Sequence, residues 1–149
     1  MRIAVGSDHA GYEYKQRILE ELRQLGHEPI DMGAHSTVAV DYVDFIVPTA
    51  RAVAARDAER GIVLGGSGNG EAMAANKVRG IRCALCWNEE TAELARRHNN
   101  ANMISIGQRT ISLETALVIV RKWLETPFDG GRHERRIKKL DAIEPFVGK

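Results

Sequence analysis

Five short apolar segments alternate with longer segments of helical periodicity, and this alternation limits the possible folds more than any other feature of the chain. The short segments are predicted strands, at residues 3–6, 28–32, 61–64, 82–86 and 103–106. Strands that alternate with helices form a parallel sheet covered by helices on both faces. The sequence therefore predicts an α/β fold, specifically a three-layer α/β/α Rossmann-like sandwich with a five-stranded parallel sheet.

Apolar residues between and after these strands recur three or four positions apart, as on a helix with one buried face. Six helices are expected, at residues 12–25, 42–56, 71–77, 88–98, 113–125 and 134–146. Gly26 is a typical end for the first, and Asn88 can cap the fourth. The chain has 149 residues and shows no repeat or linker. Residues 1–149 are therefore expected to form a single domain.

Charge gives little indication of a charged partner. Lys and Arg number 21 against 20 Asp and Glu, a net charge of +1, so we expect no nucleic-acid or membrane partner. Basic residues nevertheless gather near the C-terminus, and such a run is usually a solvated helix face. Its members are Arg132, His133, Arg135, Arg136, Lys138 and Lys139.

The two cysteines, Cys83 and Cys86, form a C-x-x-C motif inside a predicted strand. Residues three apart in a strand face opposite sides, so this spacing suits neither redox chemistry nor half of a metal site. We expect buried, unlinked thiols. Reduced thiols fit a cytoplasmic protein. Residues 2–6 are predicted to form a strand and do not resemble the apolar core of a signal peptide, so we again expect a cytoplasmic protein.

A loop with four glycines connects the third strand directly to a helix. It reads Gly65-Gly66-Ser67-Gly68-Asn69-Gly70. Successive backbone N–H groups at a helix start can cradle an anion. The loop matches neither the Walker motif nor the dinucleotide fingerprint. A tight strand–helix turn is the alternative, although a simple turn needs fewer glycines.

Glu71 follows the glycine loop, in the first turn of the expected helix. One interpretation is a favourable position in the field of the helix dipole. The other is a general base beside an oxyanion site, the combination that an enediolate intermediate requires. Position alone leaves both interpretations open.

Other polar residues lie at strand ends, where ligands bind in open α/β sheets. Asp8 and His9 follow the first strand and Arg109 follows the fifth, whereas His98 and Asn99 precede the fifth strand at a helix end. Each can be a cap or a surface residue, but together with the glycine loop they can converge on one cleft. No nucleophile elbow and no metal-ligand spacing is present.

These residues together resemble the ribose-5-phosphate isomerase B family, which also includes galactose-6-phosphate isomerase subunits. The resemblance covers nearly the whole chain. It is carried by Gly6-Ser7-Asp8-His9-Ala10-Gly11, Asp41-Tyr42, residues 65–71, Ala74-Ala75-Asn76-Lys77, Arg97-His98-Asn99-Asn100, Gly107-Gln108-Arg109 and Gly131-Arg132-His133-x-x-Arg136.

The resemblance implies an aldose–ketose isomerase that interconverts ribose 5-phosphate and ribulose 5-phosphate through an enediolate, without metal or other cofactor. In one branch of the family the base is a Cys at the end of the third strand, where this chain has Gly65. In the other branch it is a Glu after the loop, which Glu71 matches. The alternatives are an isomerase of six-carbon sugar phosphates such as allose or galactose 6-phosphate, or a non-catalytic sugar-phosphate-binding protein.

Site roles also follow from the resemblance. His98, helped by Asp8, would open the furanose ring. The enediolate and its oxygens would be held by Gly66, Ser67, Gly68, Asn69, Gly70 and Asn99, and the phosphate by His9, Arg109, Arg132 and Arg136. Arg132 and Arg136 are four apart and share one helical face.

Tyr42 would line the sugar pocket, and Val43 departs from the Pro that the family usually has there. The resemblance implies a homodimer with shared active sites, in which Asp8 and Glu71 come from one chain and His98, Asn99 and Arg109 from its partner. A tetramer of dimers stays open. The topology agrees, because His98 and Asn99 end a helix that runs back toward the opposite edge of the sheet from Glu71.

Overall fold

The computed structural model describes residues 1–143, which form one five-stranded, all-parallel sheet with six helices. The strands are β1 (Arg2–Ser7), β2 (Glu28–Asp31), β3 (Arg60–Gly65), β4 (Cys83–Leu85) and β5 (Met103–Gly107). The helices are α1 (Tyr12–Gln24), α2 (Val43–Ala54), α3 (Asn69–Asn76), α4 (Glu89–Arg97), α5 (Leu113–Glu125) and α6 (Arg132–Asp141). The predicted fold class is confirmed.

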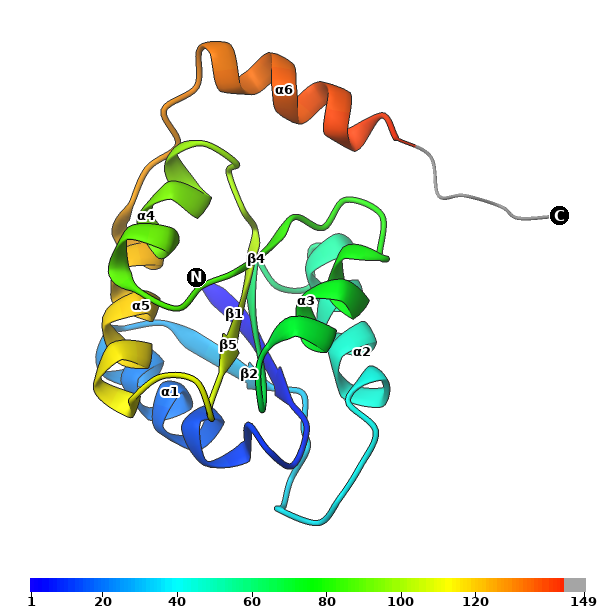
Figure 1. The fold of residues 1–149 in the computed structure, drawn as a ribbon, viewed down its shortest axis with the longest axis vertical. Coiled ribbons are helices and arrows are strands. Elements are labelled where there is room, and N and C mark those ends of the chain that lie inside the picture. Colours follow the sequence, from blue (N-terminus) through cyan, green and yellow to red (C-terminus); the bar gives the residue numbers. More distant parts are fainter. Residues whose placement is uncertain (144–149) are drawn as a thin grey trace, which may run out of the picture.

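The helices form two layers around the sheet. Figure 1 shows α1, α4 and α5 on one side of the strands and α2 and α3 on the other. Side chains alternate along each strand, so β1 supplies Ile3 and Val5 to the core under the first layer and Ala4 to the core under the second. Trp123 of α5 is completely buried in the first core.

The strand order is β2-β1-β3-β5-β4. The chain builds the sheet outward in one direction from β1 and in the other direction from β3, so the topological switch point lies between these two strands. The helices that follow these two strands, α1 and α3, pack on opposite faces of the sheet (Figure 1). Ser7 pairs with Leu64 in the register of β1 and β3. Asp8 and the glycine loop therefore begin side by side, at the position where open α/β sheets bind ligands.

Several boundaries differ from the expected ones. Helix α3 begins at Asn69 rather than at residue 71, because its N-cap Gly68 has a φ of +81° that turns the strand end directly into the helix. Helix α6 begins at Arg132, two residues early, after Gly131 with a φ of +58°. The expected C-terminal part of this helix, at residues 144–146, lies outside the described residues. Asn88 caps α4 as predicted, accepting a hydrogen bond from the Thr91 N–H at 2.8 Å.

The two cysteines lie on opposite faces of the sheet, as the strand prediction requires. Cys83 belongs to the core under α2 and α3, and Cys86 to the core under α1, α4 and α5. Both thiols are free, and burial raises the pKa of each, that of Cys86 to about 12. They are therefore protonated, inert core residues at neutral pH.

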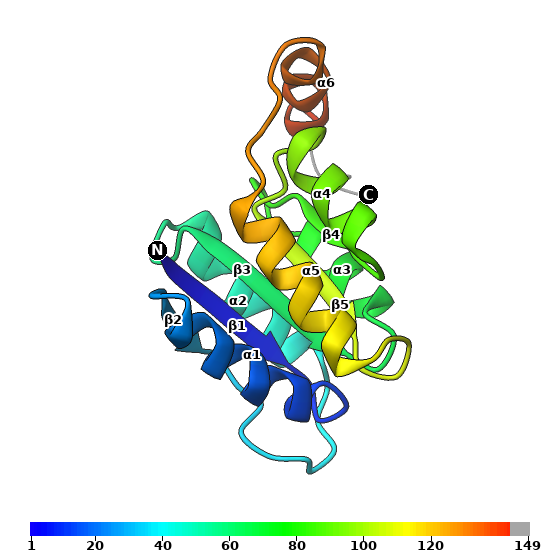
Figure 2. The same cartoon turned by 90° about the vertical axis from the view of Figure 1, so that its left-hand side faces the viewer.

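Helix α6 lies apart from both layers. Figures 1 and 2 show it beyond the ends of α4 and β4, connected to α5 by an extended segment. Its buried residues are His133 and Ile137, whereas Leu140 is 49% exposed. In the part of the chain that the structure describes, no helix combines the length and apolar character needed to cross a membrane.

Candidate active site

The glycine loop is held in place by the segment that follows β5. The backbone N–H groups of Gln108 and Arg109 donate to the carbonyls of Gly65 and Gly66, both at 2.9 Å. The buried Ser105 hydroxyl donates to the Gly68 carbonyl at 2.7 Å. The loop thus enters α3 with a fixed conformation, and the positive end of the α3 dipole faces the end of β3.

Glu71 folds back from α3 over this loop. Only 4% of the residue is exposed, and a Cβ atom at Gly65 would overlap with its carboxylate. Burial raises the pKa of Glu71, as does the charge of Asp8, while the backbone N–H groups of Glu71 and Gly68 oppose the change. A buried carboxylate of raised pKa at the end of a strand has the properties of a general base.

Asp8 lies next to Glu71 and is 8% exposed. Its Oδ1 accepts hydrogen bonds from the N–H groups of Ala10 and Gly11, at 2.9 and 3.1 Å. Asp8 therefore stabilises the turn that leads into α1, which is the structural role considered for it. Its charge also acts on Glu71.

Tyr42 and His9 lie at the same end of the sheet. The Tyr42 ring packs against the loop, because a Cβ atom at Gly70 would be 2.9 Å from its Cζ. The Val40 N–H donates to Nδ1 of His9 at 3.1 Å. In this arrangement Nδ1 is the acceptor, so the imidazole proton of neutral His9 resides on Nε2.

Arg109 also belongs to this group, and here the structure corrects an expectation. Its backbone N–H binds the Gly66 carbonyl, and its Nη1 would be 3.1 Å from a Cβ atom at Gly66. Arg109 therefore lies beside the glycine loop of its own chain rather than with His98. The reason is the register of β3 and β5, which pairs Gly65 with Gly107 and brings the two following loops together.

A second group gathers at the opposite end of β5. His98 stacks on His133 of α6, with ring centroids 4.4 Å apart and an interplanar angle of 12°. Both rings line a pocket of about 320 Å³ together with Asn99, Arg136, Ile137 and Leu140. Burial lowers the pKa of His133, as do the charges of His98, Arg132 and Arg136. His133 was not identified as a site residue from the sequence, although it lies within the Gly131–Arg136 motif.

The predicted site residues thus form two groups within one chain. Asp8, His9, Tyr42, Glu71, Arg109 and the glycine loop lie at the carboxyl ends of the strands, whereas His98, Asn99, Arg132 and Arg136 lie near the amino end of β5. The five residues of β5 separate the two ends by roughly 15 Å. The prediction that one chain places Glu71 and His98 at different ends is confirmed. The expected phosphate ligands are divided between the two groups as well.

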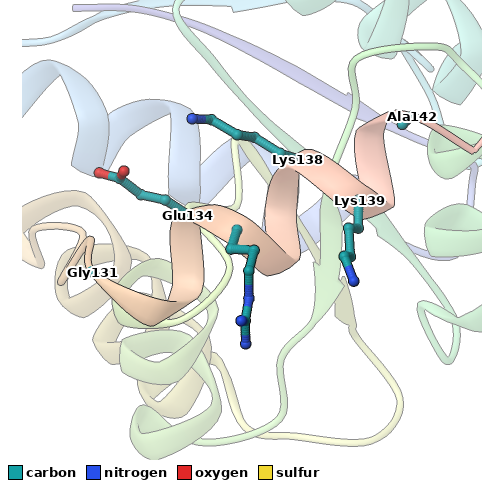
Figure 3. Close-up of a pocket in the computed structure, with 6 residues that line it drawn as sticks. Gly131, Glu134, Lys138, Lys139 and Ala142 are labelled. Carbon is teal, nitrogen blue, oxygen red and sulfur yellow. The ribbon is translucent and has the colours of Figure 1, made fainter.

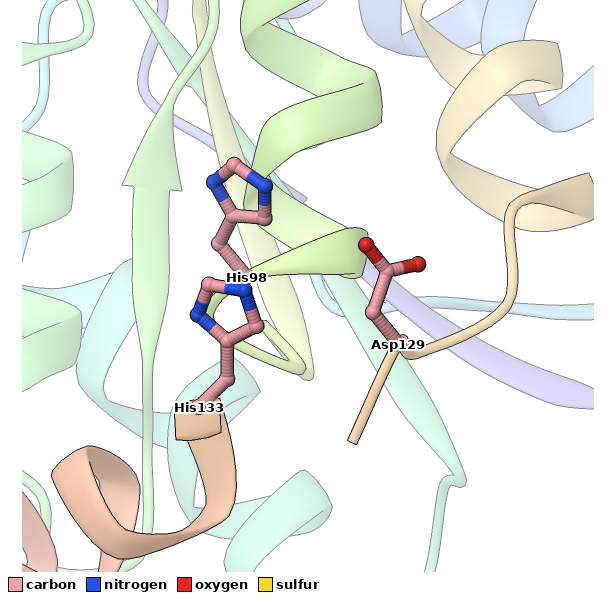
Figure 4. A group of neighbouring side chains, drawn as sticks. All are labelled: His98, Asp129 and His133. Atoms are coloured by element: carbon pink, nitrogen blue, oxygen red, sulfur yellow. The ribbon is translucent and has the colours of Figure 1, made fainter. Parts of the chain in front are cut away.

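His98, Asp129 and His133 also have the composition of a metal site. Their ligand atoms lie within 4.8 Å of one another (Figure 4). The Asp129 carboxylate, however, is already paired with the Nε of Arg97 at 3.1 Å. Arg132 and Arg136 add positive charge close to His133. This excess of positive charge favours an anion over a cation here.

The rest of the basic run faces elsewhere. Glu134, Lys138 and Lys139 extend from α6 around an open hollow of about 450 Å³ (Figure 3). Arg135, Gly131 and Ala142 complete its lining, and none of these was a predicted site residue. The basic run therefore divides: Arg136 lines the pocket with His98, and the lysines remain on a solvated face.

Comparison with known proteins gives consistent results over nearly the whole chain. A family model described as Ribose/Galactose Isomerase matches residues 3–140. Ribose-5-phosphate isomerase B of Mycobacterium tuberculosis (strain H37Rv) is 53% identical over 146 residues, covering 97% of this chain and 90% of that protein. Ribose-5-phosphate isomerase B of Escherichia coli K12 is 40% identical over 143 residues, covering 96% of each.

Solved structures give the same result. Ribose-5-phosphate isomerase B of Clostridium thermocellum superimposes with a TM-score of 0.94 at 46% identity, covering 95% of both chains. The type B ribose 5-phosphate isomerase of Trypanosoma brucei gives a TM-score of 0.93 at 42% identity, covering 96% of this chain and 98% of that one.

Proposed function

Because the chain belongs to the ribose/galactose isomerase family, we propose that it interconverts ribose 5-phosphate and ribulose 5-phosphate. The observation that carries the proposal is the buried Glu71 carboxylate, folded over the glycine loop at the carboxyl end of β3. We propose a five-carbon rather than a six-carbon sugar phosphate as substrate because relatives that are 53% and 40% identical are named ribose-5-phosphate isomerase B.

In the proposed reaction Glu71 removes the proton from C2 of the open-chain aldose and returns it to C1, while the proton of the C2 hydroxyl passes to the C1 oxygen. The raised pKa of Glu71 brings its basicity closer to neutral pH, where a general base is most effective. Backbone N–H groups of residues 66–70 and the N-terminus of α3 stabilise the enediolate oxygen, with the Ser67 hydroxyl beside them. This proton transfer requires neither a metal nor a nucleotide.

The choice of Glu71 rather than a cysteine as base has a steric basis in this chain. A side chain at position 65 would occupy the space of the Glu71 carboxylate. The glycine at the end of β3 therefore admits the carboxylate, and the chain's own cysteines are buried in the core with raised pKa values. These observations support membership of the glutamate branch.

We further propose a homodimer with shared active sites. His98 and Asn99 of one chain would face Asp8 and Glu71 of the other, and His98 would open the furanose ring. Arg132 and Arg136 would then meet His9 and Arg109 around the phosphate. The separated groups in one chain support this arrangement, as do the exposed Leu140 and Ile143 at the C-terminal end of α6, which lies outside the two helix layers. Reduced, buried thiols support a cytoplasmic location.

The decisive experiment measures kcat/KM for a panel of five- and six-carbon aldose phosphates, with the Glu71→Gln variant as control. We expect ribose 5-phosphate to give the highest value and the variant to be nearly inactive. In D₂O, the product should acquire solvent deuterium through the enediolate. A higher kcat/KM for a six-carbon substrate would refute the assigned sugar. Binding without turnover by the wild-type protein would refute enzymatic function.

A further inference from the structure

Arg82, just before β4, connects three parts of the chain through one guanidinium group. Its Nε donates to the Asn99 carbonyl at 3.0 Å, and its Nη2 donates to the Asn100 carbonyl at 3.1 Å. Its Nη1 binds both carboxylate oxygens of Asp141 at 3.0 Å. The side chain is only 16% exposed. The planar, multiply donating fork of Arg suits this task, and a Lys ammonium cannot reproduce it.

The carbonyl contacts fix the segment that presents His98 and Asn99. Asn100 has a φ of +44°, the left-handed conformation that Asn adopts more readily than most residues other than glycine and that often ends a helix. Backbone hydrogen bonds also hold this turn, because the Asn100 N–H donates to the Arg96 carbonyl at 3.0 Å and the Ala101 N–H donates to the Ala95 carbonyl at 2.9 Å. Arg82 binds the carbonyls of two successive peptide units, one on each side of Asn100, so it helps to fix how this turn leaves α4.

The carboxylate contact fixes α6. Asp141 is the last residue of α6, and the segment before the helix is held separately, by the Arg97–Asp129 ion pair and by the Asp129 N–H, which donates to the Arg97 carbonyl at 3.0 Å. The helix is thus tied at both ends to the region around the end of α4. Between the two ties lies the pocket lined by His98, Asn99 and Arg136.

We propose that Arg82 is a positioning residue for the isomerisation: it holds the ring-opening group and the phosphate-binding helix in one fixed arrangement. This inference rests on the proposed function. The two sets of contacts that Arg82 makes have separate consequences. Loss of the ion pair with Asp141 frees the C-terminal end of α6, which weakens phosphate binding. Loss of Arg82 also releases the turn at Asn99 and Asn100, which misplaces His98.

The test compares Arg82→Ala, Arg82→Lys and Asp141→Ala in the full chain. Asp141→Ala should raise KM for ribose 5-phosphate by roughly tenfold, with kcat within about twofold. Arg82→Ala should raise KM similarly and also lower kcat by about tenfold or more. Arg82→Lys should not restore kcat. The matched control is Glu21→Ala, which removes the carboxylate partner of Arg121 between α1 and α5 and should leave both constants unchanged.

Two further measurements separate positioning from stability and from the proposed function. Melting curves give the folded fraction, and NMR spectra follow the His98 ring signals in each variant, with inorganic phosphate titrated as the ligand. Shifted His98 signals and weaker phosphate binding in folded Arg82→Ala would support the inference. Unchanged signals and constants, or losses that only follow the folded fraction, would overturn it. A wild-type chain without turnover would instead refute the proposed function. If Arg82→Ala does not fold, the same measurements on Arg82→Lys and Asp141→Ala test the inference. Wild-type kinetic constants in both would overturn it.

Discussion

The surroundings of Glu71 oppose one another in their effect on the pKa of its carboxyl group. Its helix-start position would normally stabilise a carboxylate through the dipole. In the folded chain, burial and the charge of Asp8 outweigh this effect, so the pKa of Glu71 is raised instead. The predicted position in the first turn of α3 is confirmed, whereas the role of Glu71 as the base stays a prediction.

Glu71→Gln is expected to lower kcat by about 10² to 10⁴, the typical loss for a missing general base, while leaving substrate binding within about tenfold. The acidic limb of the wild-type pH–kcat profile should lie at higher pH than an ordinary glutamate would give, since the base must be ionised. Steady-state kinetics across pH measure both quantities. Full activity of the Gln variant would rule out Glu71 as the base.

The same substitution has a predicted effect on stability. Because the folded pKa of Glu71 is raised, the folded state binds more protons than the unfolded state between the two pKa values, and wild-type stability falls as pH rises through that range. Glu71→Gln lacks this loss. The melting temperature of the variant relative to wild type should increase from acidic to neutral pH and then level off. A constant difference across pH would contradict the raised pKa.

Gly65→Ala is expected to displace the Glu71 carboxylate and to reduce kcat severely, because the added Cβ overlaps with it. If this displacement is the cause, the substitution should cost almost nothing further in a Glu71→Ala background, where the space is free. A double-mutant cycle on kcat measures the coupling. Additive losses would show that Gly65 acts through something other than Glu71.

At the scale of single elements, the start of α2 explains one departure from the family pattern. Val43 is the first residue of α2, and Tyr42 before it has helical φ and ψ of −58° and −35°. A proline at position 43 would disfavour that conformation of Tyr42. In the observed conformation the Tyr42 ring packs against Gly70.

Val43→Pro is accordingly expected to move Tyr42 toward extended backbone and to change KM for ribose 5-phosphate by a few-fold, with kcat nearly retained, since Tyr42 packs against the glycine loop and has no proposed role in proton transfer. Val43→Ala is the matched control and should keep the wild-type KM. A Pro variant with unchanged KM would show that Tyr42 packs equally well from either conformation.

Helix α6 divides its basic residues between two surfaces, which gives a matched pair of substitutions. Arg136→Ala should weaken kcat/KM for ribose 5-phosphate by about ten- to a hundredfold, the typical loss for a charged hydrogen bond, and leave slow turnover of free ribose almost unchanged. Arg135→Ala, at the hollow on the other surface, should have little effect. Equal losses for both substrates would place Arg136 outside the phosphate site.

At the scale of the whole molecule, the two groups of site residues cannot meet within one chain. Glu71→Ala and His98→Ala should each be nearly inactive alone. After the two are unfolded and refolded together, about half of the dimers should be mixed, each with one intact site, so activity should recover to about a quarter of wild type. Mass spectrometry establishes that mixed dimers formed. Mixed dimers without activity would refute shared sites.

The fold class, the opposed burial of Cys83 and Cys86, and the separation of Glu71 from His98 could all be predicted from the sequence. These follow from strand and helix periods and from chain direction, which are local properties. Element ends were less predictable, since Gly68 and Gly131 start α3 and α6 earlier than the apolar pattern suggested.

The contacts between segments far apart in the sequence could not be predicted and became known from the folded chain. The strand order put Asp8 beside the glycine loop, and the pairing of β3 with β5 put Arg109 there too, against the expectation that a partner chain supplies it. The stack of His98 on His133 and the contacts of Arg82 join residues far apart in the sequence. No local pattern encodes these contacts, because sheet order and side-chain packing depend on the balance of burial over the whole chain.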